Sequence, residues 1–203
     1  KLGETLDRFS GLLAEHGLGG ADLSRILGGS RNLGAMILRG DRNLTLPHIR
    51  KLAVWLPPGY DGSGHRRFPA LYDFAGFTGS GLAHLNWKPF SENLVERVAR
   101  LVHERKMPPM ILVMPDCYTA LGGNQYLNSS AIGRYADYLT REIVPFVDAE
   151  FRTLAAREHR GCFGKSSGGY GALVHGMKYP ATWGAIADHS GDAYFDFLYR
   201  SDW

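Results

Sequence analysis

The chain has 203 residues, of which 44% are hydrophobic, and its formal net charge at pH 7 is +3. This hydrophobic share can bury a sizeable core, most simply in one domain with a smaller appendage. Basic residues are scattered among acidic ones, so the charge pattern excludes the basic stripe of a nucleic-acid-binding surface. No apolar run reaches the length of a membrane span, and nothing at the N-terminus resembles a signal peptide. We therefore expect neither a nucleic-acid nor a membrane partner.

The two cysteines, Cys117 and Cys162, lie in separate apolar stretches. Their surroundings predict buried thiols and not a disulfide, which is typical of a reducing compartment. We therefore expect a cytoplasmic protein, although the sequence begins at Lys1 and not at a methionine. We expect no metal ion and no cofactor, and the sequence makes no prediction of the oligomeric state.

Residues 1–47 differ in pattern from the rest of the chain. Apolar residues recur at helical spacing from Leu2 to Leu13, and Gly17 is placed to end that helix. Such a stripe predicts packing against a larger domain, and no polar group in it suggests chemistry. We therefore expect an N-terminal appendage over residues 1–47 and a second domain over residues 48–203.

In the second domain, strand-like segments mostly alternate with helix-like ones. Residues 110–114 form a continuous apolar run, which is typical of a central parallel strand. A long amphipathic helix is expected over residues 132–151, with a kink at Pro145. Residues 183–187 predict another buried strand. This alternation predicts an α/β fold with three layers and a mostly parallel sheet.

A glycine-rich stretch carries the expected chemistry. Gly164, Ser166 and Gly168 form the pattern G-x-S-x-G between a strand-like and a helix-like run, the context that this motif requires. A serine at the tip of a sharp strand-to-helix turn has strained backbone angles, and the glycines let strand and helix close around it. The helix N-terminus supplies N–H groups where an oxyanion would form. The pattern therefore predicts that Ser166 is a nucleophile.

This stretch has two other interpretations. Gly164-Lys165-Ser166 looks like the end of a phosphate-binding loop, but the first glycine of that motif would fall on His159, so this interpretation fails. The second alternative is a glycine-rich turn that only packs a helix on a strand. The correct context on both sides of the motif favours the nucleophile.

Two further loops follow predicted strands. The glycine-rich segment Ala75–Gly79 can offer a backbone N–H, from Phe77 or Thr78, toward Ser166. Residues 116–130 are dense in amides and phenols, and loops after strands of an α/β sheet commonly bind ligands. A simple solvated connection explains this second loop equally well.

Several motifs lie in a familiar order and spacing: Val54-x-Leu56-Pro57-Pro58-Gly59-Tyr60-Asp61, Phe68-Pro69-Ala70-Leu71-Tyr72, Gly133-Arg134-Tyr135, Glu142-Ile143-Val144-Pro145 and the G-x-S-x-G stretch. Over residues 50–192 they resemble the Putative esterase branch of the α/β-hydrolases. That branch includes S-formylglutathione hydrolases (esterase D), feruloyl and acetylxylan esterases, enterochelin esterases and mycolyltransferases.

The resemblance implies an α/β-hydrolase fold and a serine carboxylesterase that acts on a small-molecule ester through an acyl-enzyme on Ser166. The oxyanion hole would use the backbone N–H groups of Phe77 and Ser167. Two residues depart from the family, since Ala75 replaces a histidine and Ser167 replaces a hydrophobic residue, but both changes leave the backbone donors in place. We expect the pocket walls among the following residues: Trp87, Asn124, Gln125, Tyr126, Tyr170 and His189.

In this family the acid and the histidine of the triad follow later strands. Two more strand–helix units, of about 30 residues each, would be needed after Trp203 to supply them. We therefore expect that the C-terminal strands of the fold are missing from the sequence. Within it, Asp192 is the alternative acid and His189 the alternative base. Two other functions remain open, acyl transfer to an alcohol or sugar and non-catalytic binding.

Overall fold

A computed structural model describes residues 52–60, 64–119, 121–198 and 200. All of them belong to one compact unit, Leu52–Trp203. The helix expected near the N-terminus lies outside the described residues, so the division into an appendage and a main domain stays a prediction.

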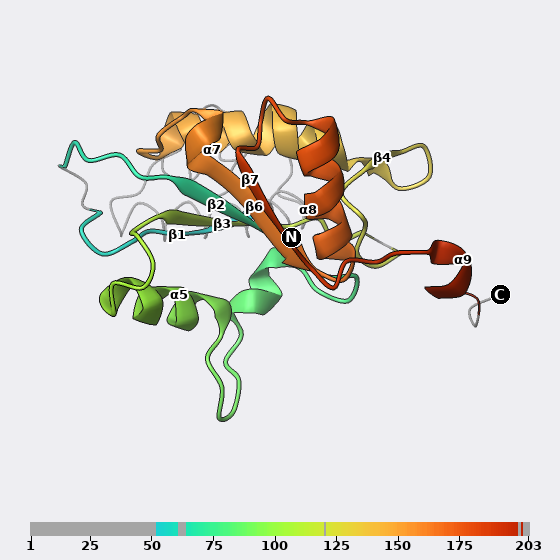
Figure 1. Cartoon of the computed structure of the whole chain (residues 1–203), viewed down its shortest axis with the longest axis horizontal. Helices are drawn as coiled ribbons and strands as arrows, with labels where there is room; N and C mark the ends of the chain where they lie inside the picture. Colours follow the sequence, from blue (N-terminus) through green and yellow to red (C-terminus); the bar gives the residue numbers. More distant parts are fainter. Residues whose placement is uncertain (1–51, 61–63, 120, 199, 201–203) are drawn as a thin grey trace, which may run out of the picture. The chain divides into compact units, whose positions relative to one another are not determined.

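A five-stranded sheet forms the centre of this unit (Figure 1). Its strands lie in the order β1-β3-β2-β6-β7, and β1 runs antiparallel to β3 while the other neighbours are parallel. The strands span Leu52–Trp55 (β1), Ala70–Phe74 (β2), Ile111–Pro115 (β3), Arg160–Lys165 (β6) and Ala185–His189 (β7). A short hairpin, β4 (Asn128–Ser129) and β5 (Gly133–Arg134), lies outside the sheet. The predicted α/β class and the mostly parallel sheet are confirmed.

Helices cover both faces of the sheet, because successive side chains of a strand point to opposite faces. Helix α5 (Leu94–His103) lies on one face, where Val98 packs with Leu112 and Met114 of β3. Helices α7 (Val144–Glu150) and α8 (Ser167–Lys178) lie on the other face, as Figure 1 shows. There, Tyr72 and Phe74 of β2 join the main core cluster.

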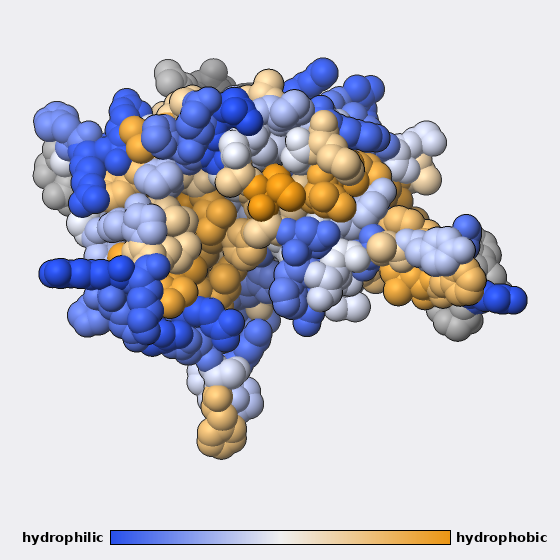
Figure 2. All heavy atoms as spheres, in the orientation of Figure 1, coloured by the Kyte–Doolittle hydropathy of each residue, from blue (hydrophilic) through white to orange (hydrophobic). Residues whose placement is uncertain are grey.

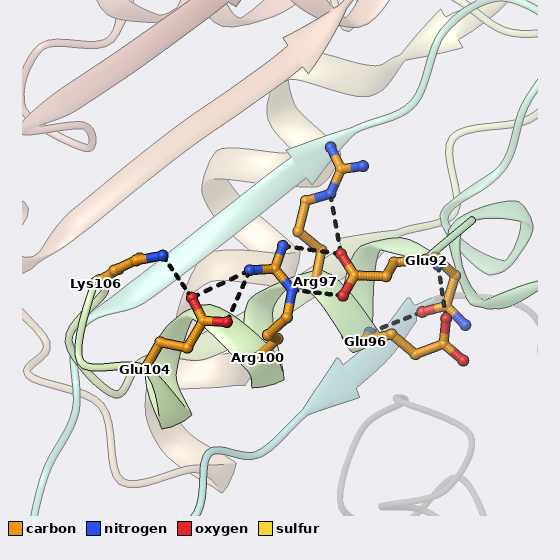
Figure 3. Close-up of polar contacts among 7 residues, drawn as sticks. Glu92, Glu96, Arg97, Arg100, Glu104 and Lys106 are labelled. Atoms are coloured by element: carbon orange, nitrogen blue, oxygen red, sulfur yellow. Dashed lines mark hydrogen bonds and ion pairs between the residues drawn. The ribbon is translucent and has the colours of Figure 1, made fainter. Parts of the chain in front are cut away.

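Helix α5 fixes the segment that follows the first glycine-rich loop. Asn93 and Glu96 form a reciprocal capping box at its start, which satisfies two N–H groups of the first turn. The side chain of Asn93 also donates to the carbonyl of Leu85, at the end of the 3₁₀ helix η1 (Gly81–Leu85). On the outer face, Arg100 lies between Glu92 and Glu104 (Figure 3). Such exposed ion pairs contribute little stability.

The long helix expected over residues 132–151 is divided into three parts. These are α6 (Tyr135–Asp137), the π-helical segment η2 (Tyr138–Ile143) and α7, with Pro145 in the first turn of α7. Proline lacks the N–H that would continue the α-helical ladder, and a wider π turn before it accommodates the lost hydrogen bond. The irregularity at Pro145 therefore appears as a π segment and not as a simple kink.

Strand β7 differs from its prediction in position and burial. It covers Ala185–His189, all five residues are exposed, and buried Trp183 precedes it. Among the described strands, β7 lies at the edge of the sheet and pairs only with β6. The prediction of a buried strand over residues 183–187 is therefore wrong, since an edge strand needs no apolar neighbours on its open side.

Candidate active site

Ser166 lies at the turn between β6 and α8, so the predicted strand–turn–helix context is present. Its backbone angles are φ 57° and ψ −126°. A non-glycine residue in such a region carries strain of about 1–3 kcal/mol, which persists only when the surroundings hold it. The end of β7 contributes to that hold, because Ser166 N–H donates to the carbonyl of His189 at 3.2 Å.

The two glycines of the motif allow β2 to press against this turn. A Cβ at Gly168 would lie 1.8 Å from the carbonyl oxygen of Phe74, the last residue of β2. A Cβ at Gly164 would lie 2.5 Å from the same oxygen and 2.4 Å from the carbonyl carbon of Gly168. Only glycine fits at either position, and the end of β2 is thereby brought next to Ser166.

The segment that leaves β2 places a peptide N–H near the serine. A Cβ at Gly76 would lie 3.8 Å from the Cβ of Ser166, so the two residues are close neighbours. The carbonyl of Gly76 accepts from Gly79 N–H at 3.0 Å, and in a trans peptide the N–H of Phe77 points the opposite way. No described residue accepts from that N–H. Ser167 begins α8, where N–H groups have no intrahelical acceptor.

Asp192 binds the turn through its carboxylate. Its Oδ1 accepts from Ser166 Oγ at 2.9 Å, and its Oδ2 accepts from Ser167 Oγ at 2.5 Å. The Asp192 side chain is nearly buried, with 8% exposed. A triad acid would accept from a histidine ring, whereas here both carboxylate oxygens face serine hydroxyls. Asp192, the residue expected as an alternative acid, therefore lies at the site, but it binds the two serine hydroxyls and not a histidine ring of the described residues.

His189 reaches the site only through its main chain in this structure. It ends β7 with an exposed side chain, and its carbonyl is the acceptor for Ser166 N–H. No histidine ring among the described residues hydrogen-bonds to Ser166 Oγ. The geometry therefore does not present His189 as a base already paired with the nucleophile.

Two of the residues expected in a pocket wall are turned inward. Asn124 and Tyr126 are each 2% exposed. The amide of Asn124 donates to the carbonyl of Cys117 and accepts from Tyr126 N–H, both at 2.5 Å. Tyr126 Oη–H donates to the carbonyl of Ala75 at 2.7 Å. Buried polar groups need such partners, so we assign both side chains to the interior of the loop and not to a pocket surface.

The other expected wall residues are more scattered. Trp87 is 79% exposed, in the segment between η1 and α5 that projects from the body of the unit in Figure 1. Gln125 is half-buried, and its carbonyl lies against Gly171 of α8. The ring of Tyr170 packs edge-on against Phe195 of α9 (Phe195–Leu198) at 5.1 Å. Apolar side chains of α9 are exposed at the right of Figure 2.

The loop after β3 reaches the segment that carries Phe77. Gly123 N–H donates to the carbonyl of Phe77 at 2.7 Å, and the Phe77 ring lies against Gly122. The second loop therefore contributes to the site by holding the first one. Both leave the same edge of the sheet, as expected for parallel strands.

A partly buried histidine–aspartate pair beside this site was not predicted from the sequence. Asp73 of β2 is 2% exposed and hydrogen-bonds to Nδ1 of His84 in η1. The hydrogen bond to Asp73 raises the pKa of His84, against an opposite effect of burial. An acidic residue inside the apolar run of residues 70–74 was the available signal.

In the part of the chain that the structure describes, no group of three His, Cys, Asp or Glu side chains could hold a metal ion.

Comparison with known proteins identifies one family. The family model described as "Putative esterase" matches residues 45–195. Esterase Rv1288 of Mycobacterium tuberculosis is 32% identical over 146 residues, which cover 69% of this chain and 28% of that protein. The Bacillus subtilis protein YbbA, described as uncharacterized, is 22% identical over 167 residues.

Solved structures share the fold. A ferulic acid esterase from Anaeromyces mucronatus, in complex with ferulic acid, superposes with a TM-score of 0.59 at 23% identity, covering 72% of this chain and 54% of that one. The Staphylococcus aureus fluorophosphonate-binding serine hydrolase FphF superposes with a TM-score of 0.58 at 18% identity, covering 75% and 55%. The chain thus spans about half the length of these structures and less of the mycobacterial relative.

Proposed function

The chain belongs to the Putative esterase family, and from this membership we propose that the protein is a serine carboxylesterase with Ser166 as its nucleophile. The observation that carries the proposal is the strained turn at Ser166, at the start of α8 and beside Gly76. The substrate would be a small-molecule ester, and no cofactor takes part. The names of similar proteins, esterase and ferulic acid esterase, support this class of reaction.

In this mechanism Ser166 Oγ attacks the carbonyl carbon of the ester while its proton passes to a general base. The carbonyl oxygen becomes negative and is stabilised by the N–H groups of Phe77 and Ser167. The C–O bond to the alcohol then breaks, and the alcohol leaves with the proton from the base. Water next attacks the carbonyl carbon of the acyl-serine and gives a proton to the base; the bond to Ser166 Oγ breaks, Oγ takes that proton back, and the acid is released.

The general base is a histidine by likeness to the family, and we assign it to no residue of the described part of the chain. Asp192 has a separate role in this proposal. It holds the hydroxyl of Ser166 before substrate binds, and the hydroxyl must turn from the carboxylate toward the base for acylation.

Two alternatives share this site. An acyltransferase would use the same acyl-enzyme with an alcohol or sugar as the acceptor, and product analysis with added acceptor distinguishes it from a hydrolase. A non-catalytic binding module is the second alternative. It is favoured by one observation, that the hydroxyl of Ser166 is bound to Asp192 and to no described histidine.

The test uses the full-length protein, a p-nitrophenyl ester and a fluorophosphonate probe. Ser166→Ala should lower turnover on the order of 10³-fold or more, because triad members act as a unit. The wild type should be labelled by the probe and the variant should not. Ser129→Ala, in the β4–β5 hairpin, is the matched control and should keep both properties. Near-normal turnover by Ser166→Ala would disprove the nucleophile, and an unlabelled, inactive wild type would favour the binding module.

A cytoplasmic location remains part of the proposal. It is supported by Cys117 and Cys162, which are both buried free thiols, as expected in a reducing compartment. As a separate finding, the described helices include none that is both long enough and apolar enough to cross a membrane.

A further inference from the structure

Tyr126 occupies a strained and fully enclosed position beside the site. Its φ is 62°, a value that non-glycine residues seldom adopt, and its side chain is 2% exposed. The ring stacks on Phe74 with a centroid distance of 4.4 Å and an interplanar angle of 12°. Gly171 of α8 makes room for the ring, because a Cβ there would lie 2.6 Å from Cδ2 of Tyr126. Strain of this kind is retained where the surroundings enforce one conformation.

Each polar group of Tyr126 has a partner. Its N–H donates to Asn124, its carbonyl faces Nε2 of His175 at 2.8 Å, and its Oη–H donates to the carbonyl of Ala75 at 2.7 Å. Trp183 Nε1–H donates to Nδ1 of His175 at 3.1 Å, so the ring proton lies on Nε2 and is donated to Tyr126. A chain of hydrogen bonds therefore runs from Trp183 through His175 and Tyr126 to Ala75.

This series of hydrogen bonds ends at Ala75, the residue that joins β2 to the Phe77 loop. Tyr126 holds the carbonyl of Ala75, and Gly123 N–H holds the carbonyl of Phe77 at 2.7 Å. These two contacts flank the Gly76–Phe77 peptide, and both come from the loop after β3. An oxyanion donor works only when it is held within about 0.5 Å of its working position.

We propose that Tyr126 is a positioning residue for the oxyanion hole, acting through Ala75 to hold the N–H of Phe77 in place. This inference rests on the proposed ester chemistry at Ser166. Tyr126 touches no substrate in this role, because its hydroxyl is buried against main chain. Burial also raises the pKa of Tyr126 well above its usual range, so the phenol stays protonated and remains a donor.

The direct test is Tyr126→Phe, which removes the hydroxyl and keeps the stacked ring. Tyr72→Phe is the matched control. Tyr72 is also a buried tyrosine of the main core, but the polar groups that act on its hydroxyl are Asp148 and Arg160 and none of the residues of the Phe77 loop. Ester turnover is measured in the full-length protein and expressed per folded molecule by titration with the fluorophosphonate. Hydrogen exchange of the segment Ala75–Gly79 is measured in the same samples.

We expect Tyr126→Phe to lower kcat about 10-fold with little change in KM. Loss of a whole oxyanion donor costs 10²–10³-fold, and a displaced donor should cost less. An interaction realised only in the transition state affects kcat and not KM. Exchange of Ala75–Gly79 should become faster, and Tyr72→Phe should change neither quantity.

The outcomes separate this inference from the proposed function. Wild-type kcat and exchange in Tyr126→Phe would overturn the inference, and so would lower thermal stability with unchanged kcat per folded molecule. An inactive wild type would refute the proposed function instead. The exchange comparison would then still decide whether Tyr126 holds the Phe77 loop, and equal exchange in both variants would disprove it.

Discussion

The hydroxyl of Ser166 donates to Oδ1 of Asp192 across 2.9 Å, and Asp192 N–H returns a hydrogen bond to the carbonyl of Ser166 at 3.3 Å. The second carboxylate oxygen accepts from Ser167, the first residue of α8. One acidic residue thus fixes both the nucleophile and the start of the helix behind it. A negative charge at a helix N-terminus is also favoured by the helix dipole.

Asp192→Asn should weaken this arrangement, because the amide NH2 that replaces one carboxylate oxygen donates and cannot accept, so one of the two serine hydroxyls loses its acceptor. We expect a loss of about 1.5–3 kcal/mol in the free energy of unfolding, the range for hydrogen bonds to a charged group. Turnover should fall about 10-fold, because the turn that carries Ser166 and the start of α8 are held less firmly. Urea unfolding and ester hydrolysis measure the two effects. Asp196→Asn, an equal charge change on exposed α9, should leave both unchanged, and equal stabilities of the two variants would contradict the prediction.

Gly168, in the turn at Ser166, and Gly76, in the segment after β2, should differ sharply in their tolerance of a methyl group. Gly168→Ala would place Cβ 1.8 Å from the carbonyl oxygen of Phe74, which is main chain and cannot rotate away. Overpacking usually costs about 1–3 kcal/mol, and a clash with backbone should exceed 3 kcal/mol in the free energy of unfolding. Gly76→Ala is the control, since its nearest atom, the carbonyl oxygen of Lys165, would lie 3.4 Å away. Urea unfolding that shows equal losses for both variants would refute the steric argument.

The turn at Ser166 could be predicted from the sequence because its requirements are local. A strand, a sharp turn and a helix close around a serine only if Gly164 and Gly168 lack side chains, and this leaves a readable pattern. The contact with Asp192 has no such pattern. It depends on how the loop after β7 folds back, 26 residues further along the chain.

The loop after β3 shows a different limit. Its amides and phenols predicted a polar surface, yet Asn124 and Tyr126 point inward and satisfy main-chain groups. Composition gives the same signal for both arrangements, because a buried loop needs polar side chains as much as a binding site does. The prediction that β7 is buried was wrong for a related reason, since edge and central strands can carry similar sequences.

The pair of His84 and Asp73 predicts a pH dependence of stability. The hydrogen bond to Asp73 raises the pKa of His84 above its unfolded value of 6.5, while burial and Lys88 act in the opposite direction. A group whose pKa is raised on folding binds its proton more tightly in the native state. The resulting stabilisation is therefore fully present below pH 6.5 and is lost as the pH rises through the folded pKa.

His84→Gln should consequently be less stable than the wild type at pH 6, and the difference in the free energy of unfolding should shrink toward pH 9. The pair fastens η1 to β2 just beyond the Phe77 loop, so hydrogen exchange of Gly81–Leu85 should be faster in the variant at pH 6. Urea unfolding at a series of pH values gives the energy difference. His103→Gln removes an exposed histidine at the end of α5 and is the control for the substitution itself, with which the difference for His84→Gln is compared at each pH. A stability difference for His84→Gln that is constant from pH 6 to 9 would show that the pair contributes no proton-linked stability.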